Sequence, residues 1–427
     1  MDKNFRKYII LWLSQSVSQL GSAMTSFALI LWVYTVRHSA LTVSLMSFCS
    51  YVPYILISPF AGTFVDRHSK KKIMLAADSI AALCTCSVLI LSMSGNLQIW
   101  HIYLINTVIG CMNAFQSPAS SVALGKLVPQ DKLANVSGMN SFSGNLTTVL
   151  TPVLAAALFA INGLPLILFI DLCSFAAAFG VLLLAITIPE QAPSETERQS
   201  LFGGCKDGLQ FLWNNKGILM IVLTMALLNF FSRLTYENIL SPMLLSRSGD
   251  NSMVLGIVNA VMGIGGIAGG LIVSAGKLSK DNIRMIYVSA ALSFGFGDLL
   301  MGVGQNAIVW GIAGLAASLP IPFINAGQNV ILYKKVPVEM QGRIFAVRNA
   351  IQYSTIPLGI LLGGFLADYV FEPFMQGNTP AASTLQKLVG VGTGSGMAVM
   401  FLCTGILGLT FSVLSYYHKD IQAMRKE

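Results

Sequence analysis

Basic residues in this chain gather in clusters that fall in every second connection between long apolar segments. Most of the 26 Lys and Arg residues belong to this alternating set. Short loops that carry Lys and Arg are retained on the cytoplasmic side of a membrane. The alternation therefore predicts a chain that crosses a membrane many times and has both termini in the cytoplasm. The clusters are Lys3, Arg6 and Lys7; Arg67, Lys70, Lys71 and Lys72; Lys126 and Lys132; Arg198, Lys206 and Lys216; Lys277, Lys280 and Arg284; Lys334, Lys335, Arg343 and Arg348; and Lys419, Arg425 and Lys426.

The composition supports the same class of protein. Hydrophobic residues make up 54% of the chain and charged residues only 10%, whereas soluble domains carry roughly 25% charged residues. A helix needs about 20 apolar residues to cross the bilayer core, where its backbone groups must pair internally. We therefore expect an all-α membrane protein with about twelve spans. Because the net charge of +8 follows from the loops, nucleic acid is not an expected partner. The spans run near 8–35, 41–65, 73–94, 99–124, 133–161, 164–188, 217–245, 253–276, 283–303, 307–332, 343–372 and 394–418.

An internal repeat divides the chain into two halves. When the second half is shifted back by 208 positions, residues 334–339 fall on residues 126–131 and Gly270 falls on Gly62. Each half has six spans, an even number, so both halves share one orientation and a substrate site is expected between them near the midplane. We expect an N-terminal half over 1–188, a cytoplasmic linker with an interfacial helix over 189–216, and a C-terminal half over 217–427.

The connection after the second span reads Gly-Thr-Phe-Val-Asp-Arg-His-Ser-Lys-Lys-Lys from Gly62 to Lys72. It resembles the signature loop of the major facilitator superfamily, and the chain as a whole is similar to the drug:proton antiporter branch that includes macrolide efflux proteins and the enterobactin exporter. Further similarities lie at 115–119, 208–209 and 336–345. Two features differ from that branch. Span four has Asn106 as its nearest polar candidate instead of an internal Arg, and the antiporter motif of span five is reduced to Thr151–Ala156.

The resemblance implies a function and a set of residues. It implies secondary active efflux of amphipathic organic compounds such as macrolide-like drugs, in exchange for protons, by a monomer in the plasma membrane. It also implies a conformational latch at the cytoplasmic end of span two, because charged side chains there contact neighbouring helix ends of opposite dipole. The latch residues are Gly62, Asp66, Arg67 and Asp78.

Charged residues inside the spans are the candidates for proton coupling, because a charge in the bilayer core is costly. Arg233 and Glu237 lie four apart in span seven and share a helix face. Either Glu237 takes up a proton beside Arg233, or the two form a static bridge to a neighbouring helix. Asp171 in span six is either a second proton carrier or a carboxylate bonded to the backbone of an adjacent helix. Asp298 and Asp368 are expected near outer helix ends, where water reaches them.

Polar residues on spans one, four, seven and ten are expected to line a central cavity, if the pattern of the family holds. Amides next to phenylalanines suit an organic molecule with both apolar bulk and hydrogen-bonding groups. Each amide is equally able to bond a neighbouring helix. The cavity candidates are Gln15, Gln19, Ser22, Asn106, Asn113, Gln116, Asn229, Tyr236, Asn325, Gln328 and Asn329.

Other classes of function find less support. The chain has no Gly-x-x-x-x-Gly-Lys-Ser/Thr loop, so a nucleotide is not expected to drive transport. The four His residues lie in or beside loops, and no catalytic cluster or metal-ligand spacing is apparent, so neither an enzyme nor a cofactor is expected. Three alternatives remain: a dedicated exporter of a siderophore or peptide, a lysolipid flippase, and a non-transporting membrane sensor or assembly partner. A non-transporting sensor would not require polar amides along a central cavity, so the cavity candidates favour a transporter over this alternative. The long outer connection at 373–393 is assigned no role.

Overall fold

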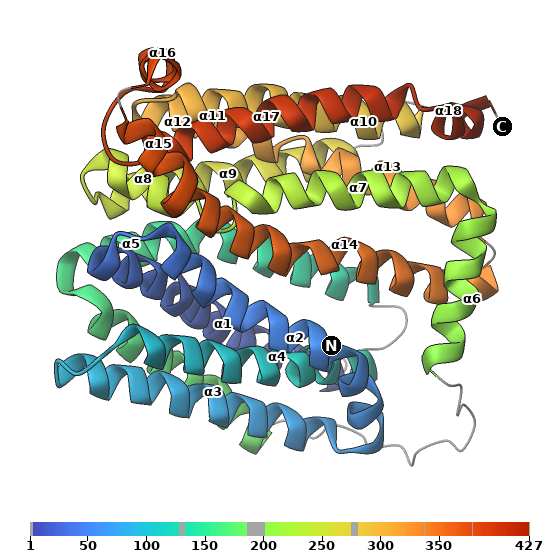
Figure 1. The fold of residues 1–427 in the computed structure, drawn as a ribbon. Coiled ribbons are helices and arrows are strands. Elements are labelled where there is room, and N and C mark those ends of the chain that lie inside the picture. Colours follow the sequence, from blue (N-terminus) through green and yellow to red (C-terminus); the bar gives the residue numbers. More distant parts are fainter. Residues whose placement is uncertain are drawn as a thin grey trace. The chain divides into compact units, whose positions relative to one another are not determined.

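A computed structural model describes residues 3–127, 133–185, 201–274, 281–336, 338–377 and 379–426, and within these ranges the chain is almost wholly helical, without strands (Figure 1). The expected all-α fold is confirmed. By their internal contacts the residues form two compact units. Unit 1 comprises Met1–His38 and Leu45–Glu195, and unit 2 comprises Ser39–Ser44 and Thr196–Glu427.

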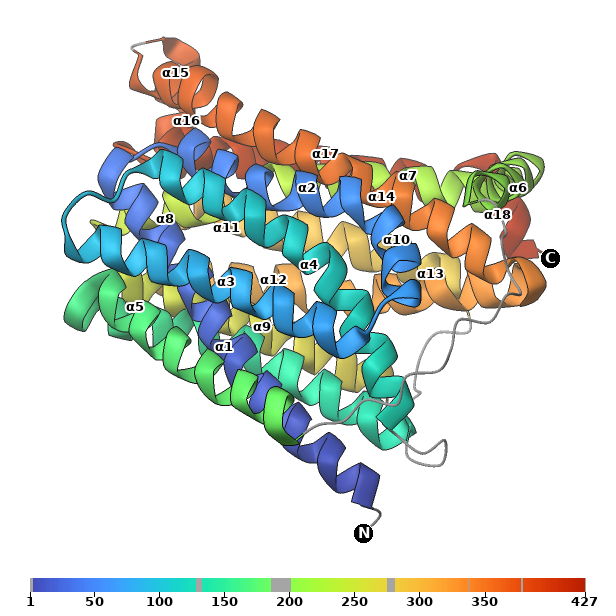
Figure 2. The same cartoon turned by 90° about the horizontal axis from the view of Figure 1, so that it is seen from below.

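Unit 1 consists of long helices with polar or glycine-containing connections. Its first three helices are α1 (Lys3–Arg37), α2 (Ala40–Arg67) and α3 (Lys70–Met93). They are followed by α4 (Ile99–Leu127), α5 (Leu133–Gly180) and the π-helical segment η2 (Val181–Ala185). The six residues Ser39–Ser44 at the start of α2 belong to unit 2. Figure 2 shows α1, α3 and α5 running alongside one another, as their contacts also indicate.

The helix α5 holds two of the predicted spans. Its backbone is non-helical at Asn162 and Gly163, where Gly163 has a φ of 63°, a value that favours glycine. Residues from both ends of the stretch, Met139 and Leu182, pack against Tyr8 in one apolar cluster. The chain therefore turns back at Gly163, as the predicted boundary between 161 and 164 requires.

Ten helical stretches of the described residues are long and apolar enough to cross a membrane. One of them, Phe142–Ala185, is 44 residues long and contains the hairpin just described. The helix α4 is 29 residues long but carries more polar side chains, Asn106, Asn113 and Gln116 among them. With α4 and the hairpin counted as spans, the helices agree with the predicted twelve. The protein is a multi-pass membrane protein.

Unit 2 contains shorter helical pieces, because several of its spans are interrupted. Span seven is divided into α7 (Lys216–Thr235) and α8 (Leu240–Ser248), and span ten into α12 (Ala307–Ser318) and α13 (Ile321–Lys335). The stretch Lys216–Ser248 is apolar enough to cross a membrane as a whole, so the span predicted near 217–245 is confirmed and contains a turn at 236–239. The remaining spans are α9 (Ser252–Ser274); α10 (Asn282–Leu292) with η3 (Ser293–Asp298) and α11 (Leu299–Val303); α14 (Val338–Leu366) with η4 (Ala367–Phe371) and α15 (Glu372–Gln376); and α17 (Ser395–Tyr416).

Three further helices of unit 2 lie outside the spans: α6 (Leu201–Asn214), α16 (Pro380–Val389) and α18 (Lys419–Lys426). The α6 helix agrees with the helix expected from Leu201 to Trp213, and its Leu212 is fully buried while Trp213 is 75% exposed. Beside the connection at 373–393, Glu372 accepts hydrogen bonds from the backbone amides of Gly394 and Met397.

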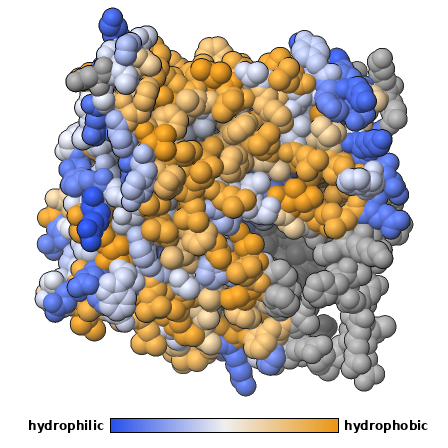
Figure 3. Space-filling model, in the orientation of Figure 1, coloured by the Kyte–Doolittle hydropathy of each residue, from blue (hydrophilic) through white to orange (hydrophobic). Residues whose placement is uncertain are grey.

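Apolar side chains cover the middle of unit 2 on the face drawn in Figure 3, and hydrophilic residues gather near α16 at one end and near α18 at the other. This is the distribution that a bilayer requires, since only the helix ends meet water. Inside the unit, Ile221, Ile286 and Phe294 belong to one apolar core that joins α7, α10 and η3.

Candidate functional site

The break in span seven is the point where polar groups of unit 2 converge. The helix α7 ends at Thr235, residues 236–239 form a turn, and α8 begins at Leu240. Arg233, Tyr236, Glu237 and Asn238 lie on or beside this turn. Interrupted helices within a membrane are tolerated where their backbone lines a site or is buried in protein, and they are typical of transporter binding sites.

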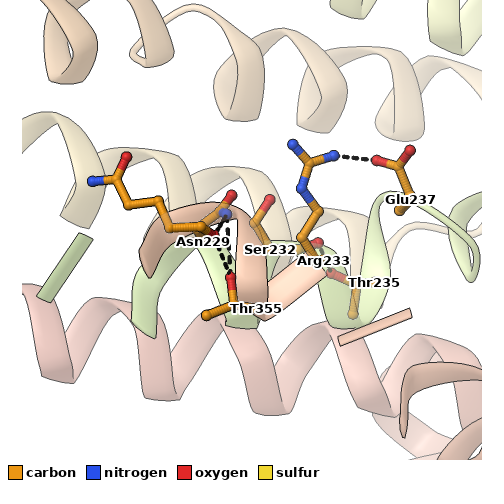
Figure 4. Close-up of polar contacts among 7 residues, drawn as sticks. Asn229, Ser232, Arg233, Thr235, Glu237 and Thr355 are labelled. Carbon is orange, nitrogen blue, oxygen red and sulfur yellow. Dashed lines mark hydrogen bonds and ion pairs between the residues drawn. The ribbon is translucent and has the colours of Figure 1, made fainter. Parts of the chain in front are cut away.

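Arg233 and Glu237 form an ion pair through Arg233 Nη1 and Glu237 Oε2 (Figure 4). The side chains are 32% and 23% exposed, so the pair is partly desolvated. The predicted contact between these two residues is confirmed. Arg233 Nε is buried and has no hydrogen-bond partner within the described residues. The guanidinium is therefore anchored by one carboxylate, whose protonation would leave a partly desolvated charge without its counterion.

Asn229 joins α7 to α14. Its Nδ2 donates to the Gln352 carbonyl at 3.0 Å and to Thr355 Oγ1 at 3.3 Å (Figure 4). Asn238, the residue after Glu237, also bonds α14, because its Nδ2 donates to the Ile360 carbonyl at 2.8 Å. Of the two roles considered for the amides, lining a cavity or bonding a neighbouring helix, Asn229 has the second.

A third polar group of the turn, Tyr236, lies beside a carboxylate on another helix. Asp298, the last residue of η3, is only 1% exposed. Thr404 Oγ1 donates to Asp298 Oδ2 at 2.8 Å, and the buried Tyr236 hydroxyl is next to the same carboxyl group. The expectation that water reaches Asp298 is wrong, because η3 packs between α12 and α17.

In unit 1, Asp171 is held by hydroxyl groups of α1. Thr25 Oγ1 donates to Oδ2 at 2.8 Å and Ser22 Oγ donates to Oδ1 at 3.1 Å. The carboxylate is 4% exposed. Gly21 allows this approach, since a Cβ there would lie 3.0 Å from Asp171 Oδ1. The described partners of Asp171 are thus side-chain hydroxyls of a neighbouring helix, and its role as a proton carrier stays a prediction.

Asp78 forms a second polar cluster in unit 1. Gln116 Nε2 of α4 donates to Asp78 Oδ1 at 2.8 Å, and the Gln15 side chain of α1 lies beside the same carboxylate. Two amides predicted for the cavity are thus joined by a residue predicted for the latch. Gln15 and Ser22 are two turns apart on α1, so this face of the helix contacts both carboxylates.

The other cavity candidates differ in their surroundings. Asn106 Nδ2 donates to the Ile102 carbonyl of its own helix, and Asn329 Oδ1 accepts from Arg348 Nη1 of α14 at 2.9 Å. Gln328 is buried. Of all the cavity candidates, the exposed ones are Gln19, Ser22, Asn113, Asn325 and Asn329.

Asp368 caps the start of α2. Its carboxylate accepts from Ser39 Oγ at 2.5 Å, from the Ala40 amide at 3.1 Å and from the Leu41 amide at 3.0 Å. An anion at a helix N-terminus satisfies donors that lack partners within the helix. Asp368 therefore anchors a helix end, as expected.

Three of the four latch residues cannot be judged in the same way. Gly62, Asp66 and Arg67 fall in the last turns of α2, but their side-chain surroundings lie outside the described part of the chain. Only Asp78 of this set has described contacts.

Comparisons with known proteins agree with this architecture. The family model for the Major Facilitator Superfamily matches residues 11–360. The chain is 24% identical over 369 residues to macrolide efflux protein A of Streptococcus pyogenes, covering 85% of this chain and 90% of that protein. It is 23% identical over 355 residues to the multidrug efflux pump Tap of Mycobacterium tuberculosis, covering 79% and 81% respectively.

Solved transporters share the fold at low sequence identity. The nucleoside transporter NupG superposes with a TM-score of 0.68 at 13% identity, covering 97% of this chain and all of that one. A bacterial homologue of the iron transporter ferroportin gives a TM-score of 0.65 at 15% identity, covering 96% of this chain.

The family match, together with the efflux proteins to which the chain is similar, indicates a membrane transporter rather than an enzyme. The chain belongs to the Major Facilitator Superfamily. It is accordingly a transporter of small molecules that is embedded in the membrane.

Proposed function

We propose that the protein exports amphipathic organic compounds, macrolide-like drugs among them, in exchange for protons by alternating access. The observation that carries the proposal is the similarity to macrolide and multidrug efflux proteins over most of the chain. The amides and aromatic rings of spans one, four, seven and ten support an amphipathic substrate, because such pockets combine apolar walls with a few polar groups.

The Arg233–Glu237 pair supports a route for coupling. A proton on Glu237 would neutralise the carboxylate and leave Arg233 without its partner, which is costly in a partly desolvated site. The change in charge would alter the packing between α7 and α14, since Gly359 of α14 packs against Arg233. Asp171 is the second candidate carrier, because hydroxyl donors hold it without an ion pair in the described residues.

The remaining assignments follow from the same proposal. Gly62, Asp66, Arg67 and Asp78 act as the cytoplasmic latch, and the protein works as a monomer in the plasma membrane with both termini in the cytoplasm. The basic clusters of every second connection support this orientation.

Export of a labelled macrolide from liposomes, driven by a pH gradient, tests the proposal. Glu237→Gln should abolish pH-driven export while the protein stays folded and inserted. Asp250→Asn is a matched control, because Asp250 lies in the loop between α8 and α9 with a φ of 59°, which Asn tolerates. Export by E237Q at the wild-type rate would contradict the role of Glu237, and Asp171→Asn would then be compared with it.

A further inference from the structure

Asp298 is a buried carboxylate that neither the predicted coupling residues nor the predicted latch include. It is 1% exposed, and its two nearest polar neighbours are the hydroxyls of Thr404 and Tyr236. Within the described residues, neither Asp298 Oδ1 nor the Tyr236 hydroxyl has a further hydrogen-bond partner. A buried ionised carboxylate needs a cation or several donors to offset its lost hydration.

The helices packed against η3 supply no cation to Asp298. α11 and α12 contain no titratable residue, and Arg284 of α10 lies about 21 Å away along the helix. Arg233 of α7 is paired with Glu237. No ion pair of Asp298 occurs among the described residues, so burial removes the hydration of the anion without supplying a counterion. The titratable and charged residues of the surrounding helices are Lys216, Arg233, Tyr236 and Glu237 on or beside α7; Arg284 and Tyr287 on α10; and Cys403 and Tyr416 on α17.

The backbone around Asp298 is also unusual. Asp298 ends the π-helical segment η3 (Ser293–Asp298), and single π-helical turns occur frequently at functional sites. Gly405 of α17 permits close packing, since a Cβ there would lie 3.1 Å from Asp298 Cβ. The span ends at Val303, about 8 Å further along the helix, and the predicted orientation makes this the outer end.

We propose that Asp298, Tyr236 and Thr404 form a proton-binding site in unit 2 that is loaded from the outer side. This inference rests on the proposed exchange of substrate for protons. A proton from outer water binds Asp298 Oδ1, and the neutral acid donates to the Tyr236 oxygen while Thr404 donates to Oδ2. After Tyr236 moves away, Asp298 releases the proton to water on the cytoplasmic side, as exchange for an exported substrate requires. Tyr236 and Glu237 are neighbours in one turn, so this site and the Arg233–Glu237 pair move together.

Infrared spectroscopy of the purified protein tests proton binding without any transport. The wild type at neutral pH should show the carbonyl stretch of a protonated carboxylic acid, and Asp298→Asn should remove that component. Tyr236→Phe should shift it to higher wavenumber, because the acid loses a hydrogen bond, and this variant serves if D298N does not fold. Asp250→Asn should leave the component unchanged. A spectrum unaffected by both D298N and Y236F would overturn the proposal, whatever the outcome for proton-driven export.

Transport by D298N in liposomes provides a second test. The variant should lose export driven by a pH gradient but keep the exchange of labelled for unlabelled macrolide at equal pH, because exchange needs no net proton movement. Loss of both activities would mean that Asp298 is only structural, and full pH-driven export would mean that it carries no coupled proton. Either result overturns the proposal.

Discussion

Glu237, Asp171, Asp298 and Asp368 are carboxylates within the spans, and their partners differ. Glu237 has a guanidinium, Asp171 has two hydroxyls from α1, and Asp298 has Thr404 and a tyrosine hydroxyl. Asp368 has the backbone amides of a helix start. Groups held only by hydroxyls lose little when they become neutral, whereas Glu237 and Asp368 lose an ion pair and a helix cap.

The hydroxyl of Thr25 should contribute measurably to stability. Thr25→Val keeps the shape of the side chain but removes the donor to the buried Asp171 carboxylate, which we expect to cost about 1–3 kcal/mol. Thermal unfolding in detergent would show a lower midpoint. Ser26→Ala on the same helix is the control, since Ser26 is exposed and bonds only its own helix backbone. Equal midpoints for the two variants would contradict this account of Asp171.

Sequence patterns identified some of these residues better than others. The spacing of Arg233 and Glu237 predicts their contact, because residues four apart on a helix are neighbours. The exposure of Asp298 was predicted wrongly, because the position of a residue along a span does not show whether neighbouring helices cover its side chain. Its burial depends on the packing of η3 between α12 and α17, which no local pattern reports. Thr404 was missed for the same reason.

At the scale of elements, the start of α2 depends on a residue of η4. Asp368→Ala removes the acceptor for the Ala40 and Leu41 amides, and loss of a cap costs about 1 kcal/mol. Hydrogen exchange at these two amides should become about fivefold faster. Asp281→Ala is the control, since Asp281 caps α10 through the Arg284 amide and pairs with Arg425 of α18, and neither of these contacts involves α2. Unchanged exchange at Ala40 and Leu41 in D368A would show that the cap contributes nothing.

The glycines of α9 differ in what their missing side chains would meet. A Cβ at Gly269 would collide with the Leu319 carbonyl, whereas one at Gly266 would meet nothing within 4 Å. Gly269→Val should therefore destabilise the protein by about 1–3 kcal/mol through overpacking, and Gly266→Val should not. Thermal unfolding of both variants checks this, and similar midpoints would be inconsistent with the α9–α12 packing. α9 contains two Gly-x-x-x-Gly pairs, Gly265–Gly269 and Gly266–Gly270, and within the described residues a Cβ would meet a neighbouring helix only at the first pair.

Element boundaries were predictable where composition changes sharply. Span ends follow the basic clusters, and the hairpin at Gly163 follows a glycine that adopts a positive φ. The break after Thr235 was not predicted, because Tyr236–Ile239 contains neither Pro nor Gly. Its cause is tertiary: Asn238 bonds α14 and Tyr236 faces Asp298, contacts that a helix-period pattern does not contain.

At the scale of the whole molecule, the charge pattern predicts one orientation. Alkaline phosphatase is active only outside the cytoplasm, so a fusion in the loop at Gly95 should be active and a fusion after Tyr417 should not. The physical reason is that Lys419, Arg425 and Lys426 resist translocation, while the connection at Gly95 lacks basic residues. Activity of the fusion after Tyr417 would reverse the predicted topology.

Family membership and the helical fold were predictable from the whole sequence because they depend on many residues at once. The identity of the substrate depends on a few side chains, so it is harder to predict from the sequence. The most direct measurement is proton flux from purified protein in liposomes after addition of a macrolide, a cationic dye, a catechol siderophore or a lysolipid. The account predicts that macrolide transport moves protons in the opposite direction and that Glu237→Gln abolishes this movement. Macrolide export without proton movement, or no response to any of the four compounds from folded protein, would contradict it.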